Sequence, residues 1–386
     1  MATTEPGLGA GVYEVPQELE EFRSVIRQIV DERIRPRAAE IDRTGEYPWD
    51  VRRLLAENDI LALPFPVEYG GTGTGTLMLQ IGVEEIAKAC ASSALILMIQ
   101  ELGSLPISLF GTDEQKQRWL PRFATGERTP AFALSEPEAG SDPASMRTFA
   151  VQDGDEWVIN GAKNWITNAT VADVYVVFAK TDRESNRCTA FIVEADRPGF
   201  DPCKLEHKLG IKGSQTGSPS FTDVRVPAGN VLGQVGKGLS VALTTLERTR
   251  LGAAAQAVGL AQGATDVANA YAKERIAFGK PISKYQTIQA KLADISTEIE
   301  AARLLTYKAA WLKDQGRDFT LTAAQAKLKT GRLAVRSAEE AVQIHGGYGY
   351  IEEYPVCRFF RDSKILTIGE GTDEVQQMVI ARAMGA

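Results

Sequence analysis

The sequence is poor in the side chains that metal centres and disulfides need. Among its 386 residues there are two histidines and four cysteines. His207 and His345 cannot form a zinc site with each other and a cysteine at any usual spacing, so we expect no metal. The cysteines are scattered rather than paired, which is typical of reduced thiols in a cytoplasmic protein. They are Cys90, Cys188, Cys203 and Cys357.

The chain also lacks long apolar runs and a basic excess. No window approaches 18 uninterrupted apolar residues, so we expect no membrane span. The first residues, MATTEPGLGAG, have neither a basic region nor an apolar run, so we predict no secretory signal. The net charge of −7 gives no general reason to bind nucleic acid, and a phosphate-bearing ligand would need locally placed Arg or Lys.

Glycine-containing segments fail the nucleotide and hydrolase motifs that they resemble. Residues 64–75 contain no complete GxGxxG and no strand–turn–helix pattern surrounds them, so we predict a flexible or tightly turning loop. Residues 213–217 place their serine at the wrong position for a GxSxG elbow. In 236–238 the residue after the lysine is not Ser or Thr, which excludes a P-loop. Hydrolase and NTPase functions therefore lose their main support.

The sequence pattern changes near residue 131, from one that predicts helices to one that predicts strands. Residues 1–130 carry apolar side chains at helical spacing and include a probable capping box at Thr112 and Gln115. Residues 131–235 instead contain short runs rich in β-branched and aromatic residues, bounded by Gly, Asp, Asn or Pro. Such runs predict strands at sandwich or barrel spacing. They lie at 156–160, 174–178, 190–193 and 220–226.

Residues 236–386 are helical again and almost free of proline. No proline occurs between Pro227 and Pro281 or between Pro281 and Pro355. Amphipathic runs fill 238–275, 286–315 and 320–344, which predicts an antiparallel helical bundle with apolar faces left for subunit contacts. The order predicts an α+β multidomain fold: an all-α domain (1–130), a β-barrel or sandwich (131–235) and a helical bundle (236–386). It argues against a doubly wound α/β fold.

A single carboxylate, Glu370, lies between Gly369 and Gly371, after an apolar run and before a probable helix that Thr372 can cap. If this turn pushes Glu370 into apolar surroundings, its pKa rises and it becomes a better base near neutral pH. A solvated surface carboxylate is the more frequent alternative for such a turn.

Two segments offer ligand-binding groups near the change from helix to sheet. In 132–142, a strand end followed by Gly140 and Ser141 exposes N–H groups and a hydroxyl, although a structural turn is a fair alternative. In 163–168, alternation places Trp165 and Thr167 on one side of a strand, where they suit a flat heteroaromatic ligand. A tryptophan in a strand is more often part of the core.

Two helix ends in the last third offer further groups. Arg275 provides a forked donor for a pyrophosphate and Phe278 could cover an adenine, while a surface salt bridge is the plainer alternative. Gly346 and Gly347 permit a left-handed helix end and also close approach of a ligand to the backbone. His345 could be a base, but without a nucleophile partner it is more often structural.

Taken together, five segments resemble the acyl-CoA dehydrogenase family of flavoproteins over about residues 17–384. They are FALSEPEAGSDP (132–143), KNWITNA (163–169), the RIAFG run (275–279), QIHGGYGY (343–350) and EGTDEVQ (370–376). The resemblance implies a helical domain, a middle β domain and a four-helix bundle as carboxy-terminal domain, assembled as a homotetramer. It implies FAD bound between the β domain and the helices, with part of the cofactor held by a neighbouring subunit. It implies acyl-CoA as substrate and electron-transferring flavoprotein as the usual electron acceptor.

Carried over by matching position, the resemblance also implies binding residues. Those at the flavin ring would be Phe132, Leu134, Ser135, Gly140, Ser141, Trp165, Ile166 and Thr167, with Thr167 near N5. Those that hold FAD across the subunit interface would be Arg275, Phe278, Gln286, Gln343, Gly346 and Gly347. Thr372 and Glu374 would complete the flavin site. The substrate-binding residues would be Ser141, Glu247, Arg250, Gly371 and Arg382.

Glu370 matches the family's catalytic base. Some relatives carry the base near position 249 of a preceding helix, but Thr249 stands there. The implied reaction removes the α-proton of an acyl-CoA thioester and transfers the β-hydride to flavin N5, yielding the trans-2-enoyl-CoA. The Glu370 backbone N–H and a ribityl hydroxyl would stabilise the enolate-like charge.

Details of the sequence bear on the acyl group. Gly369 stands where several relatives have a bulky Tyr, which favours a short- to medium-chain or branched acyl group. The helix over 93–106, expected to line the acyl tail, has no Arg, which disfavours a glutaryl-type dicarboxylate.

Two alternative functions compete with this one. An acyl-CoA oxidase or flavin monooxygenase is the alternative, although Glu370 and the complete set of flavin motifs count against it. A catalytically inactive CoA-binding or scaffold protein is a further alternative.

Overall fold

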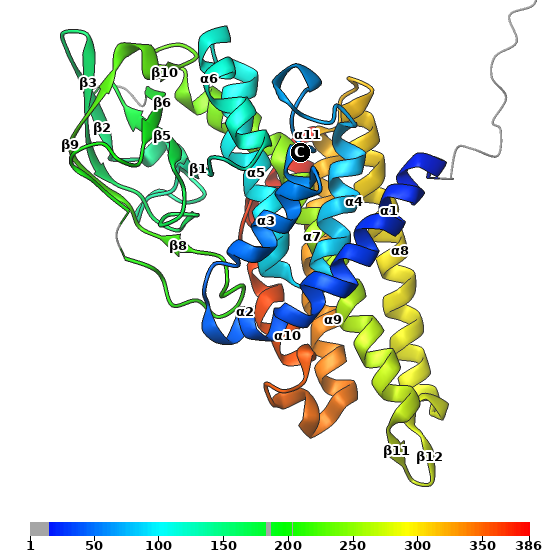
Figure 1. The fold of residues 1–386 in the computed structure, drawn as a ribbon. Coiled ribbons are helices and arrows are strands. Elements are labelled where there is room, and N and C mark those ends of the chain that lie inside the picture. Colours follow the sequence, from blue (N-terminus) through cyan, green and yellow to red (C-terminus); the bar gives the residue numbers. More distant parts are fainter. Residues whose placement is uncertain (1–14, 183–186, 203) are drawn as a thin grey trace, which may run out of the picture.

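The computed structural model describes residues 15–182, 187–202 and 204–386, which form a helical part, a β part and a second helical part (Figure 1). Cys203 and the amino-terminal segment judged to lack a secretory signal lie outside the described residues. Cys90, Cys188 and Cys357 are free thiols. The first part contains α1 (Gln17–Ile29), α2 (Ala38–Thr44), α3 (Trp49–Glu57), α4 (Gly75–Ala87), α5 (Ala91–Phe110) and α6 (Asp113–Ala124).

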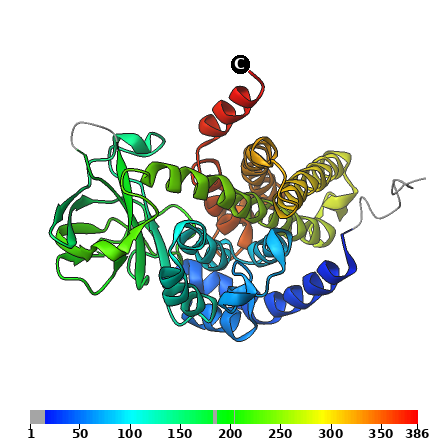
Figure 2. The same ribbon diagram turned by 90° about the horizontal axis from the view of Figure 1, so that it is seen from above.

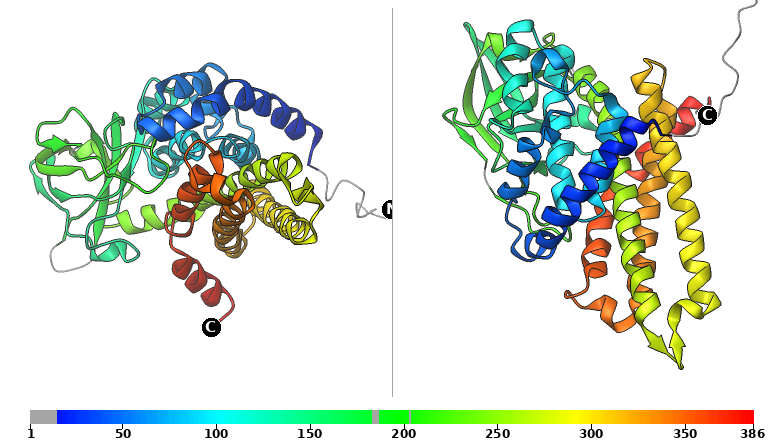
Figure 3. Two further views of the ribbon diagram at one scale, coloured as in Figure 1. Left: turned by 90° about the horizontal axis from the view of Figure 1, so that it is seen from below. Right: turned by 45° about the vertical axis from the view of Figure 1, so that its right-hand side comes forward.

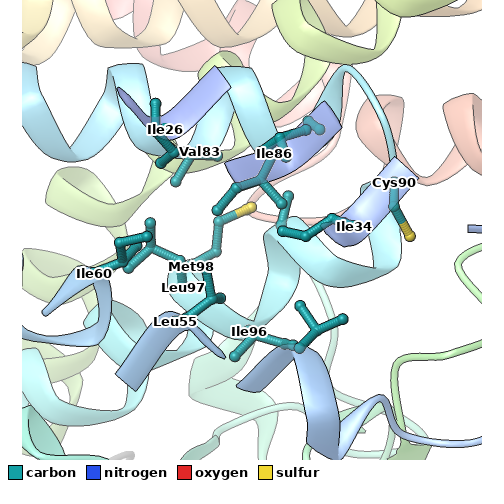
Figure 4. Close-up of a cluster of buried hydrophobic side chains, with 14 of the residues drawn as sticks. Ile26, Ile34, Leu55, Ile60, Val83, Ile86, Cys90, Ile96, Leu97 and Met98 are labelled. Carbon is teal, nitrogen blue, oxygen red and sulfur yellow. The ribbon is translucent and has the colours of Figure 1, made fainter. Parts of the chain in front are cut away.

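The amino-terminal helices pack around an apolar core that α4 and α5 fill with almost entirely buried side chains (Figure 4). The capping box is confirmed, because Thr112 Oγ1 accepts from Gln115 N and the Gln115 side chain accepts from Thr112 N. Among the described residues, α5 is the one helix long and apolar enough to cross a membrane. However, 72% of its apolar window is buried inside the protein, as in a core helix.

The β part is a single sheet of eight strands within the described residues, in the order β10-β6-β5-β2-β3-β9-β7, with β1 paired to β5. All four predicted strand segments lie within strands. Alternate residues of β5 face two apolar clusters, with Val176 on the side of α5 and Tyr175 on the other. The strands are β1 (Pro130–Ala133), β2 (Phe149–Asp153), β3 (Glu156–Ala162), β5 (Val174–Lys180), β6 (Cys188–Glu194), β7 (Phe200–Asp201), β9 (Ser220–Pro227) and β10 (Val231–Leu232). A separate pair joins β4 (Ile166–Thr167) to β8 (Thr216–Gly217).

The carboxy-terminal part is built on the long helices α7 (Gly238–Glu274), α8 (Gln286–Asp314) and α9 (Thr320–His345), which pack side by side (Figure 3). The hairpin β11 (Ile276–Ala277) to β12 (Lys280–Pro281) lies at the end of α7 far from the sheet (Figure 1). The short helix α10 (Pro355–Ser363) packs on α7 and α9. The last helix, α11 (Asp373–Ala383), packs on α9 at its start and then projects from the body (Figure 2).

The predicted α+β fold, with helical, β and helical parts in that order, is confirmed. The domain boundaries after residues 130 and 235 stay predictions. One local expectation was wrong: Trp165 does not lie in a strand. It precedes β4 with a left-handed backbone (φ 56°), so strand alternation does not apply to it.

Candidate active site

Glu370 lies in a tight turn between a 3-10 helix (Lys364–Thr367) and α11. Its backbone is left-handed (φ 56°), and Gly371 continues in the same region (φ 89°). Thr372 caps α11 as predicted, because its Oγ1 accepts from Val375 N at 3.3 Å. The cap fixes the start of α11 directly after the turn, so the position of Glu370 is tied to that helix.

The Glu370 carboxylate points to α7. Thr249 Oγ1 donates to Glu370 Oε2 at 3.1 Å, and the glutamate is only partly exposed. Burial raises the pKa of Glu370, while the Thr249 hydrogen bond and the charges of Lys327 and Arg250 oppose that rise. The alternative of a freely solvated turn carboxylate therefore does not describe Glu370.

The residues predicted to bind the substrate differ in how close they lie to the Glu370 carboxylate. Arg250 is buried on α7 and its Nη1 donates to Gln376 Oε1 at 3.2 Å. One turn earlier, Glu247 accepts a hydrogen bond from the Thr320 hydroxyl at 2.5 Å. Arg382, in contrast, is exposed near the end of the projecting α11. The structure thus brings Arg250 close to Glu370 and leaves Arg382 outside this cluster.

The predicted flavin-ring residues of the β part form a connected group. Lys163 Nζ donates to Leu134 O at 3.1 Å and to Glu136 Oε1 at 2.7 Å, and it is fully buried. Asn164 N donates to Ser135 O at 2.8 Å, which joins the segment after β1 to the segment before β4. The residues of this group differ in their exposure to solvent. Phe132, Leu134 and Ile166 are buried, Ser135 and Thr167 are partly exposed, and Gly140 and Ser141 are exposed.

Trp165 belongs to this group and is 58% exposed. The alternative that it is a core residue is therefore wrong. An exposed indole beside a partly exposed Thr167 offers a flat apolar surface and a hydroxyl to a planar ligand.

A second group of predicted cofactor residues lies elsewhere. A cleft of about 540 Å³ is lined by Arg275, Gly346 and Gly347 together with Tyr271 and Tyr348. A Cβ placed on either glycine would meet no atom within 4 Å, so a ligand can approach this backbone closely. Phe278, on the adjoining hairpin, is 97% exposed. The other members, Gln286 and Gln343, are also exposed.

The second group lies far from Thr249 and Glu370 in one chain. At a rise of about 1.5 Å per residue, the stretch of α7 from Thr249 to its end at Arg275 spans roughly 40 Å. Thr372 and Glu374 line a separate cleft of about 350 Å³ beside the Glu370 turn. The structure therefore does not bring all of the predicted cofactor residues together within a single chain.

His345 has a structural role. Its ring stacks on Tyr271 with centroids 4.1 Å apart, and its Nδ1 lies 2.8 Å from Ala341 O. Burial lowers the pKa of His345, which favours the neutral ring. The Nδ1 contact and the stacking on Tyr271 favour the structural alternative for His345 over that of a catalytic base.

Lys327 and Gln376 were missed from the sequence. Both are buried, and both donate to the carbonyl of Gly371, Lys327 at 2.5 Å and Gln376 at 3.1 Å. A signal existed for Lys327, because it falls on the buried alanine stripe of α9, three residues after Ala324. A lysine on such a stripe needs a polar partner in the interior.

As a whole, the arrangement can carry out proton abstraction. It offers a carboxylate whose pKa is raised by burial, kept ionisable by one hydroxyl and two nearby cations. Elsewhere in the chain, the exposed Trp165 indole and the open backbone at Gly346 and Gly347 offer surfaces for a planar, phosphate-bearing ligand.

Family models of acyl-CoA dehydrogenases match nearly the whole chain. The N-terminal domain model matches residues 16–127, the middle domain model 131–224 and the C-terminal domain model 236–385.

Individual proteins agree with these models. The chain is 43% identical to the short-chain specific acyl-CoA dehydrogenase of Clostridium acetobutylicum, over 96% of this chain and 98% of that protein. Butyryl-CoA dehydrogenase of Megasphaera elsdenii has a similar structure, with a TM-score of 0.94 and 42% identity over 97% of this chain and all of that one. A chain from a study of the electron transferring flavoprotein of Acidaminococcus fermentans matches with a TM-score of 0.94 and 39% identity, covering 96% and 99%.

Proposed function

Because the chain belongs to the acyl-CoA dehydrogenase family, we propose that it oxidises a short- to medium-chain acyl-CoA, straight or branched, to the trans-2-enoyl-CoA, with Glu370 as base. The protein is an oxidoreductase, and members of the family are FAD flavoproteins. The observation that carries the proposal is the Glu370 carboxylate, which has a raised pKa and accepts from Thr249 at 3.1 Å. The Clostridium relative and the Megasphaera structure are named as dehydrogenases, so the oxidase or monooxygenase alternative is not favoured.

In the proposed reaction Glu370 removes the α-proton of the bound thioester. The α C–H bond breaks and an O–H bond forms on the carboxylate, whose basicity is increased by its burial. The Thr249 hydroxyl, Lys327 and Arg250 keep enough of the carboxylate ionised to accept that proton. The Glu370 backbone N–H is the donor proposed to stabilise the negative charge on the thioester oxygen.

The residues present fit FAD. The exposed Trp165 ring and partly exposed Thr167 suit the flavin, and the open backbone at Gly346 and Gly347 beside Arg275 suits a pyrophosphate. When bound, FAD supplies the acceptor for the β-hydride. The other cofactor-binding residues that the family resemblance implies are proposed in the same roles.

We propose a homotetramer in which FAD is held by two subunits. About 40 Å of helix separates Thr249 from Arg275, and an FAD molecule is shorter than that. The 97% exposure of Phe278 also favours a partner subunit that covers it.

The acyl group and the acceptor are further proposals. The short-chain relative and the butyryl-CoA dehydrogenase structure favour a short acyl group. A Cβ on Gly369 would meet only Ile365 atoms at 3.5 Å and beyond, so this position leaves room beside Glu370. Electron-transferring flavoprotein is the proposed acceptor, in view of the Acidaminococcus match, and the cytoplasm is the proposed location.

The proposal is tested with the purified holoprotein, which should be yellow. Anaerobic addition of butyryl-CoA should bleach its visible absorbance, and Glu370→Gln should abolish bleaching while FAD stays bound. Glu339→Gln, on the exposed face of α9, is the matched control and should bleach normally. Retained bleaching in Glu370→Gln would remove this residue as the base. Peroxide formed without an added acceptor would favour an oxidase instead.

A further inference from the structure

The turn that carries Glu370 needs external support. A left-handed backbone is strained for a residue with a side chain, and it persists only where the surroundings fix it. Glu370 has this conformation at φ 56°, and the glycine that follows has φ 89°. The groups that hold this turn therefore decide where the carboxylate points.

Buried donors from α9 and α11 hold the two carbonyls of the turn. Gln376 Nε2 donates to Glu370 O at 3.2 Å and to Gly371 O at 3.1 Å. Lys327 Nζ donates to the same Gly371 oxygen at 2.5 Å. Arg250 donates to Gln376 Oε1 and so fixes which way the amide points. The turn is thus clamped from α7, α9 and α11 at once.

Among the residues of this clamp, Lys327 is the one whose burial costs the most free energy. It is 1% exposed, and within the described part of the chain no carboxylate lies within 4.0 Å of its Nζ. A buried ammonium without a close counter-charge is expensive, and a neutral side chain would fill the alanine-lined face of α9 at lower cost. A lysine at this position therefore calls for a reason beyond packing.

The charge of Lys327 acts on Glu370. Burial lowers the pKa of Lys327 to about 8. The negative charges of Asp373, Glu370 and Glu374 oppose this shift, because they raise that pKa. Lys327 therefore remains mostly protonated at neutral pH. The charged groups that act on Glu370 are Lys327 on α9 and Arg250 on α7, which favour its ionised form, and Glu101 on α5, which disfavours it.

We infer that Lys327 is a positioning residue for the base, because its bond to the Gly371 carbonyl sets the direction of the Glu370 carboxylate. The inference rests on the proposed function, since it takes Glu370 as the base. Lys327 itself touches no reacting atom and takes part in no covalent step.

The test separates proton abstraction from hydride transfer. Acetyl-CoA has no β-carbon and cannot be dehydrogenated, so exchange of its methyl hydrogens with D2O, followed by NMR, reports on the base alone. Lys327→Met in the full-length holoprotein is compared with Lys329→Met, which removes a lysine two residues away that pairs with Glu298 and is 41% exposed.

We expect Lys327→Met to slow exchange about 10- to 100-fold, because small displacements of a catalytic group have effects of that size. FAD content and thermal unfolding should match those of Lys329→Met, and the acid limb of the exchange rate should move to higher pH. Parent-like exchange in Lys327→Met, or a loss proportional to lost FAD, would overturn the inference.

If Lys327→Met does not fold, Lys327→Arg is measured, since it keeps the cation but changes its geometry. Slow exchange in a folded Arg variant supports the inference. Parent-like exchange overturns it, and so does failure of both variants to fold, because the residue then serves the fold alone. If the parent neither exchanges acetyl-CoA hydrogens nor bleaches with butyryl-CoA, the proposed function fails rather than this inference.

Discussion

The hydroxyl of Thr249 donates to Oε2 of Glu370 across 3.1 Å, although 121 residues separate them in the chain. Relatives that place their base near position 249 and those that place it at position 370 would thus present a carboxylate to the same small space. In this chain the helix position supplies a hydrogen bond to the proposed base. The contact explains how Thr249 can influence the chemistry without taking a proton.

Removal of the Thr249 hydroxyl should shift the pH dependence of the enzyme. As the proposed base, Glu370 must be ionised to act, so the rate is expected to rise with pH through its pKa. The Thr249 hydrogen bond lowers that pKa, against the rise caused by burial. In Thr249→Val the acid limb of kcat should therefore move to higher pH, with a loss of about 1 kcal/mol in stability.

The matched control is Thr265→Val, which removes a buried hydroxyl from the same helix that donates to Ala261 O. It should lower stability to a similar extent and leave the pH profile in place. An acid limb that stays in place in Thr249→Val, or moves to lower pH, would contradict this account of the hydrogen bond.

Much of the fold follows from local sequence patterns. The strand segment 174–178 lies within β5 because its alternate residues face two apolar layers, and proline-free stretches became α7 and α9. Trp165 shows the limit of such patterns. Strand alternation does not apply to Trp165, because this residue precedes the strand β4. The exposure of the Trp165 side chain follows from the left-handed backbone of that residue, which no periodic sequence pattern indicates.

The site was predictable only in part for a similar reason. Glu370 stood out because its glycine-flanked turn and its family motif lie in one short segment. The contact from Lys327 to Gly371 spans 44 residues, and the bond from Arg250 to Gln376 spans 126. Such contacts depend on how α7, α9 and α11 pack, which the pattern of any one helix does not contain.

Loss of the buried Lys163 charge should destabilise the β part. Lys163 and Glu136 form an ion pair at 2.7 Å in which both side chains are buried. Lys163→Met leaves the Glu136 carboxylate in the interior, which is expected to cost about 3–5 kcal/mol. The backbone N–H groups of Arg147 and Thr148 still bond that carboxylate, so the lower end of the range is expected. Urea unfolding followed by tryptophan fluorescence measures the loss.

A surface pair close by provides the contrast. Arg147 pairs with Glu138 through side chains that are both mostly exposed, so Arg147→Met should change stability by less than about 1 kcal/mol. Lys163→Met combined with Glu136→Gln should recover part of the loss, since no buried charge then remains unpaired. Equal effects of the two single substitutions would mean that the buried pair is not the reason for the cost.

Truncation of Phe278 should weaken FAD binding without unfolding the subunit. The ring is almost fully exposed in the single chain, on the β11–β12 hairpin far from the sheet (Figure 1). If a shared site buries it, Phe278→Ala loses about 1.5–3 kcal/mol of contact, or roughly 10- to 100-fold in FAD affinity. FAD titration of the apoprotein measures this, with Val151→Ala on the exposed side of β2 as control. Unchanged affinity would argue that Phe278 lies outside the cofactor site.

A bulky residue at position 369 should narrow the choice of acyl groups. Gly369 has no positive φ, and an added Cβ would meet only Ile365 O at 3.5 Å and Ile365 Cγ1 at 3.8 Å, so the turn should tolerate a side chain. The ring of Gly369→Tyr would stand next to the Glu370 carboxylate and compete for space with a branch on the acyl α-carbon.

We expect kcat/KM for 2-methyl-branched acyl-CoA to fall about tenfold more than for butyryl-CoA, since one methyl group typically changes discrimination by at least that factor. The ratio is measured over an acyl-CoA panel with a ferrocenium acceptor, and Gly369→Ala should lie between parent and Tyr variant. Equal losses for straight and branched substrates would show that position 369 affects the base and not the shape of the acyl pocket.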